Sequence, residues 1–187
     1  MSNSRGSSPI LRLCCCALFV ALTAVCAQLI IPIGAVPVSL SLLPVLLCGC
    51  LLPLPDALAA MGAYLLLGLA GVPVFSGLGG GPAKLLGPTG GYLVGYLPCV
   101  LITGLFIRRS RDSVPLMAAG MVLGILACYA LGTAWFVLST GTGWSAALSV
   151  CVLPFLPFDA VKVALAVVLV RALTVPLRPV MPWLRGN

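Results

Sequence analysis

Long apolar runs alternate along the chain with short segments that are rich in Gly, Pro or Arg. A helix needs about 20 apolar residues to cross the hydrocarbon core of a membrane, so the pattern predicts an all-α integral membrane protein. We expect six transmembrane helices, over residues 11–31, 40–52, 56–69, 89–107, 114–139 and 153–173. The second and third are short for complete spans, and we expect them to tilt or to pack against irregular chain.

The stretch between the third and fourth predicted helices, residues 71–95, reads GVPVFSGLGGGPAKLLGPTGGYLVG. An interior Gly costs a helix about 1 kcal/mol relative to Ala, and a Pro about 3, so most of this segment cannot form an ordinary helix. At membrane depth, irregular backbone persists only where it packs in protein or lines a cavity. We therefore predict that this Gly/Pro-rich external loop forms the wall and lid of a small-molecule site.

The composition supports a membrane protein, because 61% of the 187 residues are hydrophobic and only 7% are charged, against about 25% charged in soluble domains. No second composition class interrupts residues 1–187, which predicts a single membrane-embedded domain. The chain has no His, and its nine Cys fall almost entirely in apolar runs, where Cys acts as a small hydrophobe. We predict no metal ion and no cofactor. GGGPAK departs from the phosphate-binding loop of ATPases, which excludes that class.

The net charge is +7, and the basic residues are distributed as in a membrane protein with a defined orientation. Arginines flank the apolar runs at both chain ends and in one middle loop, and basic residues favour the cytoplasmic side. Six spans then put both termini in the cytoplasm, with Lys84 outside, and we predict no nucleic-acid partner. The arginines assigned to the cytoplasmic side are Arg5, Arg12, Arg108, Arg109, Arg111, Arg171, Arg178 and Arg185.

Asp159 and Lys162 are the most informative polar residues, because they lie three apart in the last apolar run and so share one helix face. Ionisable groups inside a membrane span are costly and usually mark a functional site. One interpretation is a ligand clamp, in which Asp159 accepts hydrogen bonds from ligand N–H groups and Lys162 donates to a carbonyl or carboxylate. The alternative is an ion pair that only fixes the helix to its neighbours.

GPTGGY, at residues 87–92, is typical of a helix start, whose unpaired N–H groups suit a ligand carboxylate. Lys84 lies nearby and either reinforces that charge or is a solvated loop cation. Phe75 and Tyr92 are candidates for apolar or aromatic walls. Within the same segment, the glycines that we assign to the ligand site are Gly80, Gly90 and Gly91.

Four segments of the chain resemble the BioY family: ALTAVCAQLIIPIGAVPVSL, YLLLGLAGVPVFSGLGGG, LLGPTGGYLVGYLP and LPFLPFDAVKVALA. They follow the family order and cover most of the chain, and the LGPTGGYLxG string is highly specific. Two residues depart from the family pattern. Ser41 stands where many relatives have Gln, which puts a hydrogen bond from that position in doubt, and Phe158 replaces a usual Gly.

The resemblance implies a six-helix S component of an energy-coupling-factor (ECF) transporter, which captures biotin at an outward-facing cavity of the bacterial cytoplasmic membrane as a multi-pass protein. It also implies that Asp159 and Lys162 contact the ureido end of biotin and that the loop before the fourth helix closes over the ligand. Ala17 and Ala21 form a small-xxx-small pair, a spacing that permits close helix approach. The resemblance implies that this pair docks on a transmembrane T protein, which is coupled to two cytoplasmic ATPase subunits.

Three other interpretations stay open at this point. The chain is an S component for another vitamin, or an intramembrane enzyme that uses Asp159 and Lys162, or a purely structural membrane subunit. The second predicts product formation by the purified protein, against which the lack of other catalytic groups counts. The third predicts no ligand binding at all.

Overall fold

The structure, a computed structural model, describes residues 9–31, 38–110 and 113–185. Arg5, Arg111 and the part of the family resemblance that falls on residues 32–37 lie outside these ranges. The helices of the described chain are α1 (Pro9–Gln28), α2 (Leu42–Leu51), α3 (Leu54–Leu69), α4 (Pro82–Leu86), α5 (Gly90–Val94), α6 (Tyr96–Ser110), α7 (Val114–Thr140), α8 (Trp144–Cys151), α9 (Leu156–Leu177) and a 3-10 turn, η1 (Pro182–Arg185). Two short antiparallel strands, β1 (Ile30–Ile31) and β2 (Val38–Ser39), follow α1.

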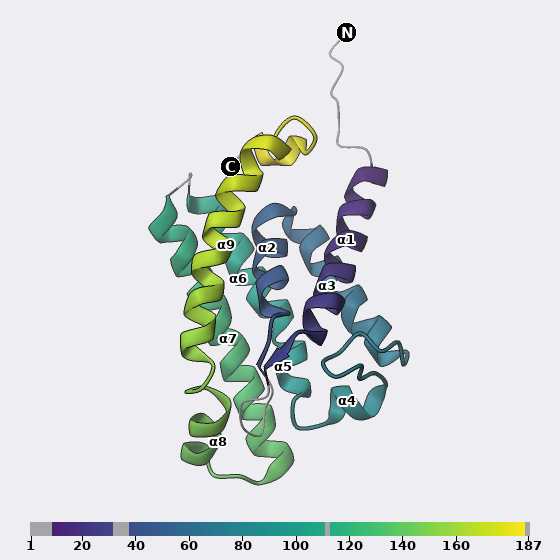
Figure 1. Cartoon of the computed structure of the whole chain (residues 1–187), viewed down its shortest axis with the longest axis vertical. Helices are drawn as coiled ribbons and strands as arrows, with labels where there is room; N and C mark the ends of the chain where they lie inside the picture. The colour runs from purple at the N-terminus through teal and green to yellow at the C-terminus, as the bar shows by residue number, and fades with distance from the viewer. Residues whose placement is uncertain (1–8, 32–37, 111–112, 186–187) are drawn as a thin grey trace.

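Four stretches of the described chain are long and apolar enough to cross a membrane, and α2 and α3 are apolar but shorter. The four stretches are Pro9–Gln28, Gly90–Arg109, Val114–Thr140 and Leu156–Leu177. The long helices run side by side (Figure 1), with both ends of the described chain at one end of the bundle and α4 and α8 at the other. The molecule is therefore a helical bundle with one end made of short, irregular elements.

The predicted helix over residues 89–107 is divided into α5 and α6 at Gly95. Pro98 has no N–H to donate to the carbonyl of Val94, four residues earlier, so the helical ladder is interrupted there. Gly95 also packs closely on α7, since a Cβ at this position would lie 2.8 Å from Sγ of Cys128. The break moves the start of this span against α7, beside the end of the bundle that carries α4.

Three further elements were not predicted. The five-residue α4 lies inside the Gly/Pro-rich segment, where Pro82 starts the helix and Gly87 follows its end. The eight-residue α8 separates α7 from α9, so the last long helix begins at Leu156 instead of residue 153. The β1–β2 ribbon pairs Ile30 with Ser39 and leads the chain from the end of α1 to the start of α2.

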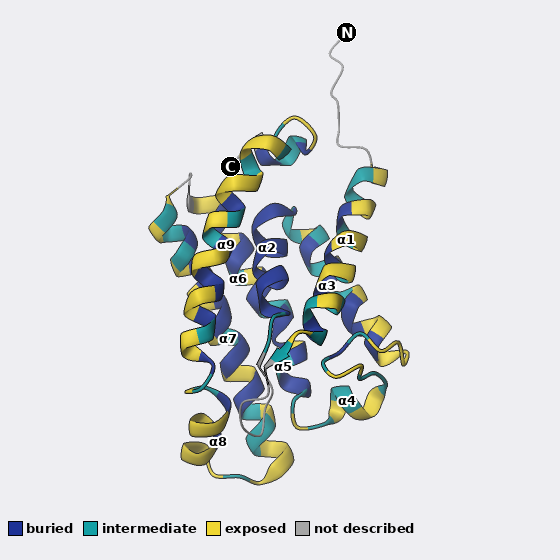
Figure 2. Ribbon diagram, in the orientation of Figure 1, coloured by how far each residue is buried: buried dark blue, intermediate teal, exposed yellow. Residues whose placement is uncertain are grey.

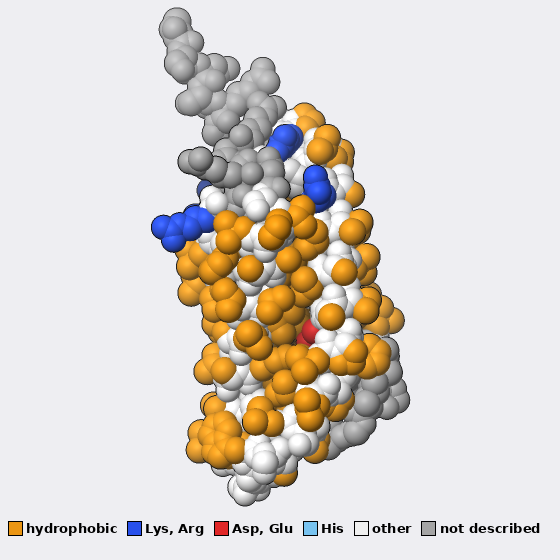
Figure 3. Space-filling view, turned by 90° about the vertical axis from the view of Figure 1, so that its left-hand side faces the viewer, with side chains coloured by type: hydrophobic (Ala, Val, Ile, Leu, Met, Phe, Trp, Pro, Cys, Tyr) orange, Lys and Arg blue, Asp and Glu red, His pale blue; other side chains and the backbone are white. Residues whose placement is uncertain are grey.

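The short helix α2 forms the centre of the bundle, and every residue from Leu42 to Leu51 is buried. It packs against α1, α3, α6 and α9, and it is the most uniformly buried helix in Figure 2. A helix that is apolar on all sides is stable only where it is surrounded. The outer helices instead expose large apolar side chains, as the orange face in Figure 3 shows, which matches a lipid environment.

One ion pair joins the first helix to the third near the end of the bundle where the described chain begins. Arg12 Nε donates to Asp56 Oδ2 at 2.6 Å, and Arg12 Nη2 donates to Asp56 Oδ1 at 2.5 Å. Asp56 lies in the first turn of α3, where the helix dipole favours a carboxylate. This two-bond contact fixes the start of α1 to the start of α3.

Candidate functional site

A cavity of about 110 Å³ lies beside α4, whose Lys84 is part of its lining. Its walls come from segments that are far apart in the sequence: the turn from β2 into α2, the loop around Ser76, the elements α4 to α7, and the first turns of α9. The polar side chains that line it are those of Ser39, Ser41, Ser76, Lys84, Thr89, Tyr92, Tyr96, Tyr129, Asp159 and Lys162. The cavity therefore combines an apolar setting with a concentrated set of hydrogen-bonding groups.

Asp159 and Lys162 form an ion pair in the wall of this cavity, with 2.8 Å between Lys162 Nζ and Asp159 Oδ1. They are buried, with exposed fractions of 4% and 7%. Asp159 lies in the first turn of α9, where the positive end of the helix dipole favours its charge. Pro157 at the start of that helix has a backbone angle suited to the position. The pair thus faces a hollow and is not simply packed between helices.

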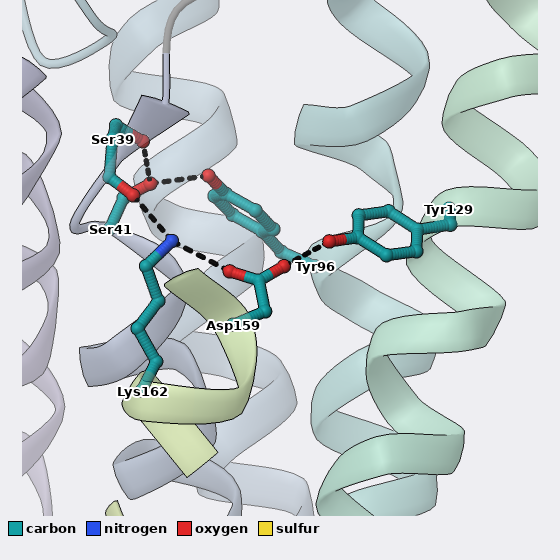
Figure 4. A network of polar contacts seen from close by, with 6 residues as sticks. All are labelled: Ser39, Ser41, Tyr96, Tyr129, Asp159 and Lys162. Atoms are coloured by element: carbon teal, nitrogen blue, oxygen red, sulfur yellow. Dashed lines mark hydrogen bonds and ion pairs between the residues drawn. The ribbon is translucent and has the colours of Figure 1, made fainter. Parts of the chain in front are cut away.

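Each member of the pair has a second partner, as Figure 4 shows. Lys162 Nζ donates to the backbone oxygen of Ser39 at 2.8 Å, and the hydroxyl of Tyr129 donates to Asp159 Oδ2. The β1–β2 ribbon positions the Ser39 carbonyl, and α7 supplies Tyr129. Because these contacts come from three separate parts of the chain, they fix the orientation of both charged groups.

A second chain of hydrogen bonds runs beside the ion pair. The hydroxyl oxygens of Ser39 and Ser41 are 2.7 Å apart, and those of Ser41 and Tyr96 are 2.6 Å apart. Ser41 is 1% exposed, so its hydroxyl needs these partners. The resemblance put a hydrogen bond from position 41 in doubt; Ser41 makes two, both within the protein.

The predicted ligand residues divide into two groups in space. Asp159, Lys162, Lys84 and Tyr92 line the same cavity. Tyr92 is held there by a 2.9 Å hydrogen bond between its hydroxyl and that of Thr133. The sequence segment at residues 87–92 also contributes Thr89 to the wall, directly before the start of α5.

The other predicted residues from the Gly/Pro-rich segment lie behind this lining. Phe75 is fully buried and packs edge-on against Tyr64, with ring centroids 5.5 Å apart. Glycine at the three remaining positions permits close backbone packing: an added Cβ would lie 2.6 Å from the Val72 oxygen at Gly80, 1.6 Å from the Leu85 oxygen at Gly90, and 2.2 Å from Trp135 Cβ at Gly91. These four residues hold the loop in shape around the cavity.

Ala17 and Ala21 lie on α1, away from this cavity. Both are exposed and border a separate groove of about 830 Å³ between α1 and α3. The facing side of that groove carries Ala59 and Ala63. The small side chains of two helices therefore open one continuous apolar surface.

Tyr129 bonds directly to Asp159 but is absent from the residues predicted for the site. It lies in the middle of α7, and thirty positions separate it from Asp159. A single Tyr in an otherwise apolar run gives little indication of where it points. The one indication in the sequence was its hydroxyl group, because a Tyr hydroxyl that is buried in an apolar helix bundle needs a hydrogen-bond partner.

The donors and acceptors of the site can serve a ligand that carries both kinds of group. An ionised carboxylate has about four lone-pair positions, and the described contacts of Asp159 use two of them. An ammonium has three donors, and Lys162 uses two. Asp159 thus retains about two acceptor positions for a ligand, and Lys162 retains one N–H donor beside them. The fold and the site define a class: a membrane-embedded binding protein for a small molecule with a polar head.

Comparison with known proteins identifies the family to which this chain is similar. The sequence model of the BioY family matches residues 1–178. A probable biotin transporter BioY from Pyrococcus horikoshii is 40% identical over 157 residues, which cover 84% of this chain and 92% of that protein. Biotin transporter BioY2 from Lactococcus lactis is 37% identical over 163 residues, with 84% and 89% covered.

A solved structure agrees with this assignment. The crystal structure of the S-component for biotin from an ECF-type ABC transporter superposes with a TM-score of 0.83 and 29% sequence identity, and the match covers 92% of this chain and 94% of that one. The chain belongs to the BioY family. It is thus a multi-pass membrane protein of a transporter family, and not an enzyme.

Proposed function

We propose that this chain captures biotin as the substrate-binding S component of an ECF transporter. The observation that carries the proposal is the buried Asp159–Lys162 pair in the wall of a cavity, held by contacts from three parts of the chain. The names of the relatives and of the solved S-component support biotin as the ligand. The rest of the chain then forms one membrane-embedded unit, over residues 1–187, that holds this cavity.

The chemistry of biotin fits the free donors and acceptors of the site. Its ureido ring offers N–H donors beside a carbonyl acceptor, while Asp159 has acceptor capacity beside the donor of Lys162. We assign the ureido N–H groups to Asp159 and the ureido carbonyl to Lys162. Lys84 and the backbone around Thr89 line the same cavity, and we assign them to the carboxylate end of the ligand.

The remaining predicted residues belong to the proposal in an indirect role. Phe75, Gly80, Gly90 and Gly91 shape the loop that covers the ligand, through the close packing described above. Tyr92 provides an aromatic wall, fixed by its bond to Thr133. In this arrangement the Gly/Pro-rich segment is both a wall and a cover.

The proposed topology has six spans, with both termini in the cytoplasm and the cavity facing outward. The spans are α1, α2, α3, α5 with α6, α7 and α9. Two observations support this orientation. Both ends of the described chain lie at one end of the bundle (Figure 1), and basic side chains gather toward that end on the face in Figure 3, as the positive-inside rule requires of a cytoplasmic side. The membrane is then the cytoplasmic membrane.

The proposed partners are a transmembrane T protein and two cytoplasmic ATPase subunits. Ala17 and Ala21 would contact the T protein, because both are exposed and border the groove between α1 and α3. Small side chains on both walls would let a partner helix approach closely. Energy for transport would come from the partners.

The deciding experiment is a titration of the purified chain with biotin, followed by competition with thiamine and riboflavin. We expect saturable binding of biotin that neither competitor displaces. Displacement by either would identify an S component for another vitamin, and failure to bind any of the three would leave a structural subunit. Chemical conversion of biotin by the purified chain would instead indicate an enzyme.

A further inference from the structure

The loop that follows α3 contains a tight turn beside the cavity. Phe75 and Gly79 exchange two backbone hydrogen bonds, of 3.0 and 3.1 Å, and so close the turn. Ser76, inside this turn, lines the cavity. Leu78 has a φ of +54°, a left-handed conformation that is unfavourable for a residue with a Cβ. Contacts from outside the turn must therefore hold it in this shape.

The last residue of α1 makes those contacts with its side chain. Gln28 Nε2 donates to the Phe75 carbonyl at 3.0 Å, and the Leu78 N–H donates to Gln28 Oε1 at 2.8 Å. A side-chain amide presents a donor and an acceptor at one tip, so one residue bonds both arms of the turn. The second bond holds the residue with the unfavourable φ.

On its other side the loop is anchored to α3. The hydroxyl of Tyr64 donates to the Val74 carbonyl at 3.0 Å, and the N–H of Gly81 donates to the Gly68 carbonyl at 2.6 Å. The ring of Phe75 lies directly over Gly68, where an added Cβ would be 2.0 Å from the ring. These contacts fix where the loop starts and ends, whereas Gln28 fixes the turn that bears Ser76.

We propose that Gln28 is a positioning residue for ligand retention: it holds the Phe75–Gly79 turn over the cavity, and so slows the escape of the bound ligand. The inference rests on the proposed function for the identity of that ligand. Leu78 is 71% exposed, so water can bond its N–H once the turn moves away. Loss of Gln28 therefore opens the turn locally and leaves the anchors on α3 in place.

The test is Gln28→Leu, which removes both bonds to the turn, together with the bond from Nε2 to the Ala24 carbonyl in the same helix, with little change in size. The matched control is Thr23→Val, on the same helix, because the Thr23 hydroxyl bonds only the Phe19 carbonyl one turn earlier among the described contacts. Biotin dissociation is followed with the purified chain in nanodiscs, after displacement of labelled biotin. Hydrogen exchange of the amides of residues 74–80 and the melting temperature without ligand are measured on the same samples.

With Gln28→Leu we expect biotin to dissociate about tenfold faster and residues 74–80 to exchange faster, at a melting temperature close to that of the wild type. Thr23→Val should leave the dissociation rate unchanged. Gln28→Glu, which keeps the acceptor for Leu78 but loses the donor to Phe75, should fall between wild type and Gln28→Leu, and it serves as the test if Gln28→Leu does not fold.

The other outcomes distinguish the positioning role of Gln28 from the proposed biotin-binding function. An unchanged dissociation rate in both Gln28 variants would refute the positioning role while biotin binding stands. The same increase in Thr23→Val would show a general effect of altering α1, and would also refute it. Absence of biotin binding by the wild type would refute the proposed function instead.

Discussion

Replacing Asp159 by Asn tests the ligand clamp with the smallest change of shape. The carboxylate accepts from Lys162 Nζ through one oxygen and from Tyr129 through the other. An amide offers one acceptor oxygen and an NH₂ donor. Lys162 will hold that oxygen, so the NH₂ group turns toward Tyr129 and the ligand. There it meets the ureido N–H groups, which cannot accept a hydrogen bond.

The size of the effect follows from the bonds that are lost. A hydrogen bond to a charged group contributes about 1.5–3 kcal/mol, and about 1.4 kcal/mol corresponds to a factor of ten in affinity. Loss of one ligand N–H bond to Asp159 should therefore raise the Kd for biotin roughly 10- to 150-fold. Stability should also fall, because Lys162 stays buried without a counter-charge, although it keeps the Ser39 carbonyl as a hydrogen-bond partner.

Calorimetric titration with biotin measures this change, and thermal unfolding without ligand reports stability separately. Asp56→Asn is the matched control, because it makes the same chemical change in the Arg12–Asp56 ion pair, which lies outside the cavity. We expect the control to alter the Kd less than threefold. If Asp159→Asn also binds biotin within threefold of the wild type while remaining folded, the assignment of the ureido N–H groups to this carboxylate is wrong.

Three further substitutions separate orientation, docking and packing. Tyr129→Phe removes one bond to Asp159 and should raise the Kd roughly fivefold, from about 1 kcal/mol for a hydrogen bond; an unchanged Kd would mean that Tyr129 does not orient the carboxylate. Ala17→Trp should leave biotin binding intact and block uptake by cells that express the complete transporter, whereas normal uptake would exclude this face of α1 from docking. Gly90→Ala places a Cβ 1.6 Å from the Leu85 oxygen, so unfolding should begin at a clearly lower temperature; a melting curve that matches the wild type would contradict the packing role.

Much of the helical framework could be predicted, because long apolar runs in a sequence indicate membrane-spanning helices. The segment over residues 114–139 agrees with α7 (Val114–Thr140) to within a residue at each end. The division at Gly95 escaped prediction, since it depends on a missing N–H at Pro98 together with contact against α7. Similarly, α8 (Trp144–Cys151) lies between two predicted spans, and with eight residues it is too short to be recognised as a separate apolar run.

The site was predictable where chemistry is conspicuous in the sequence. Asp159 and Lys162 stand out because charge is rare in this chain, and Lys84 because it interrupts a glycine-rich loop. Tyr129 could not be found in this way, because its role depends on which side of α7 faces α9. The density of Gly in residues 71–95 indicates that the backbone approaches other groups closely, but it does not identify those groups. In the structure Gly90 approaches Leu85, and Gly91 approaches Trp135.

The first helix, α1, is attached to the rest of the bundle by side-chain bonds at both of its ends. Arg12 joins its beginning to Asp56 of α3, and Gln28 joins its end to the Phe75–Gly79 turn, some 24 Å farther along at about 1.5 Å per residue. Between these attachments the side toward α3 borders a groove of about 830 Å³. A partner seated in that groove would therefore lie against the same helix whose last residue, Gln28, bonds the Phe75–Gly79 turn.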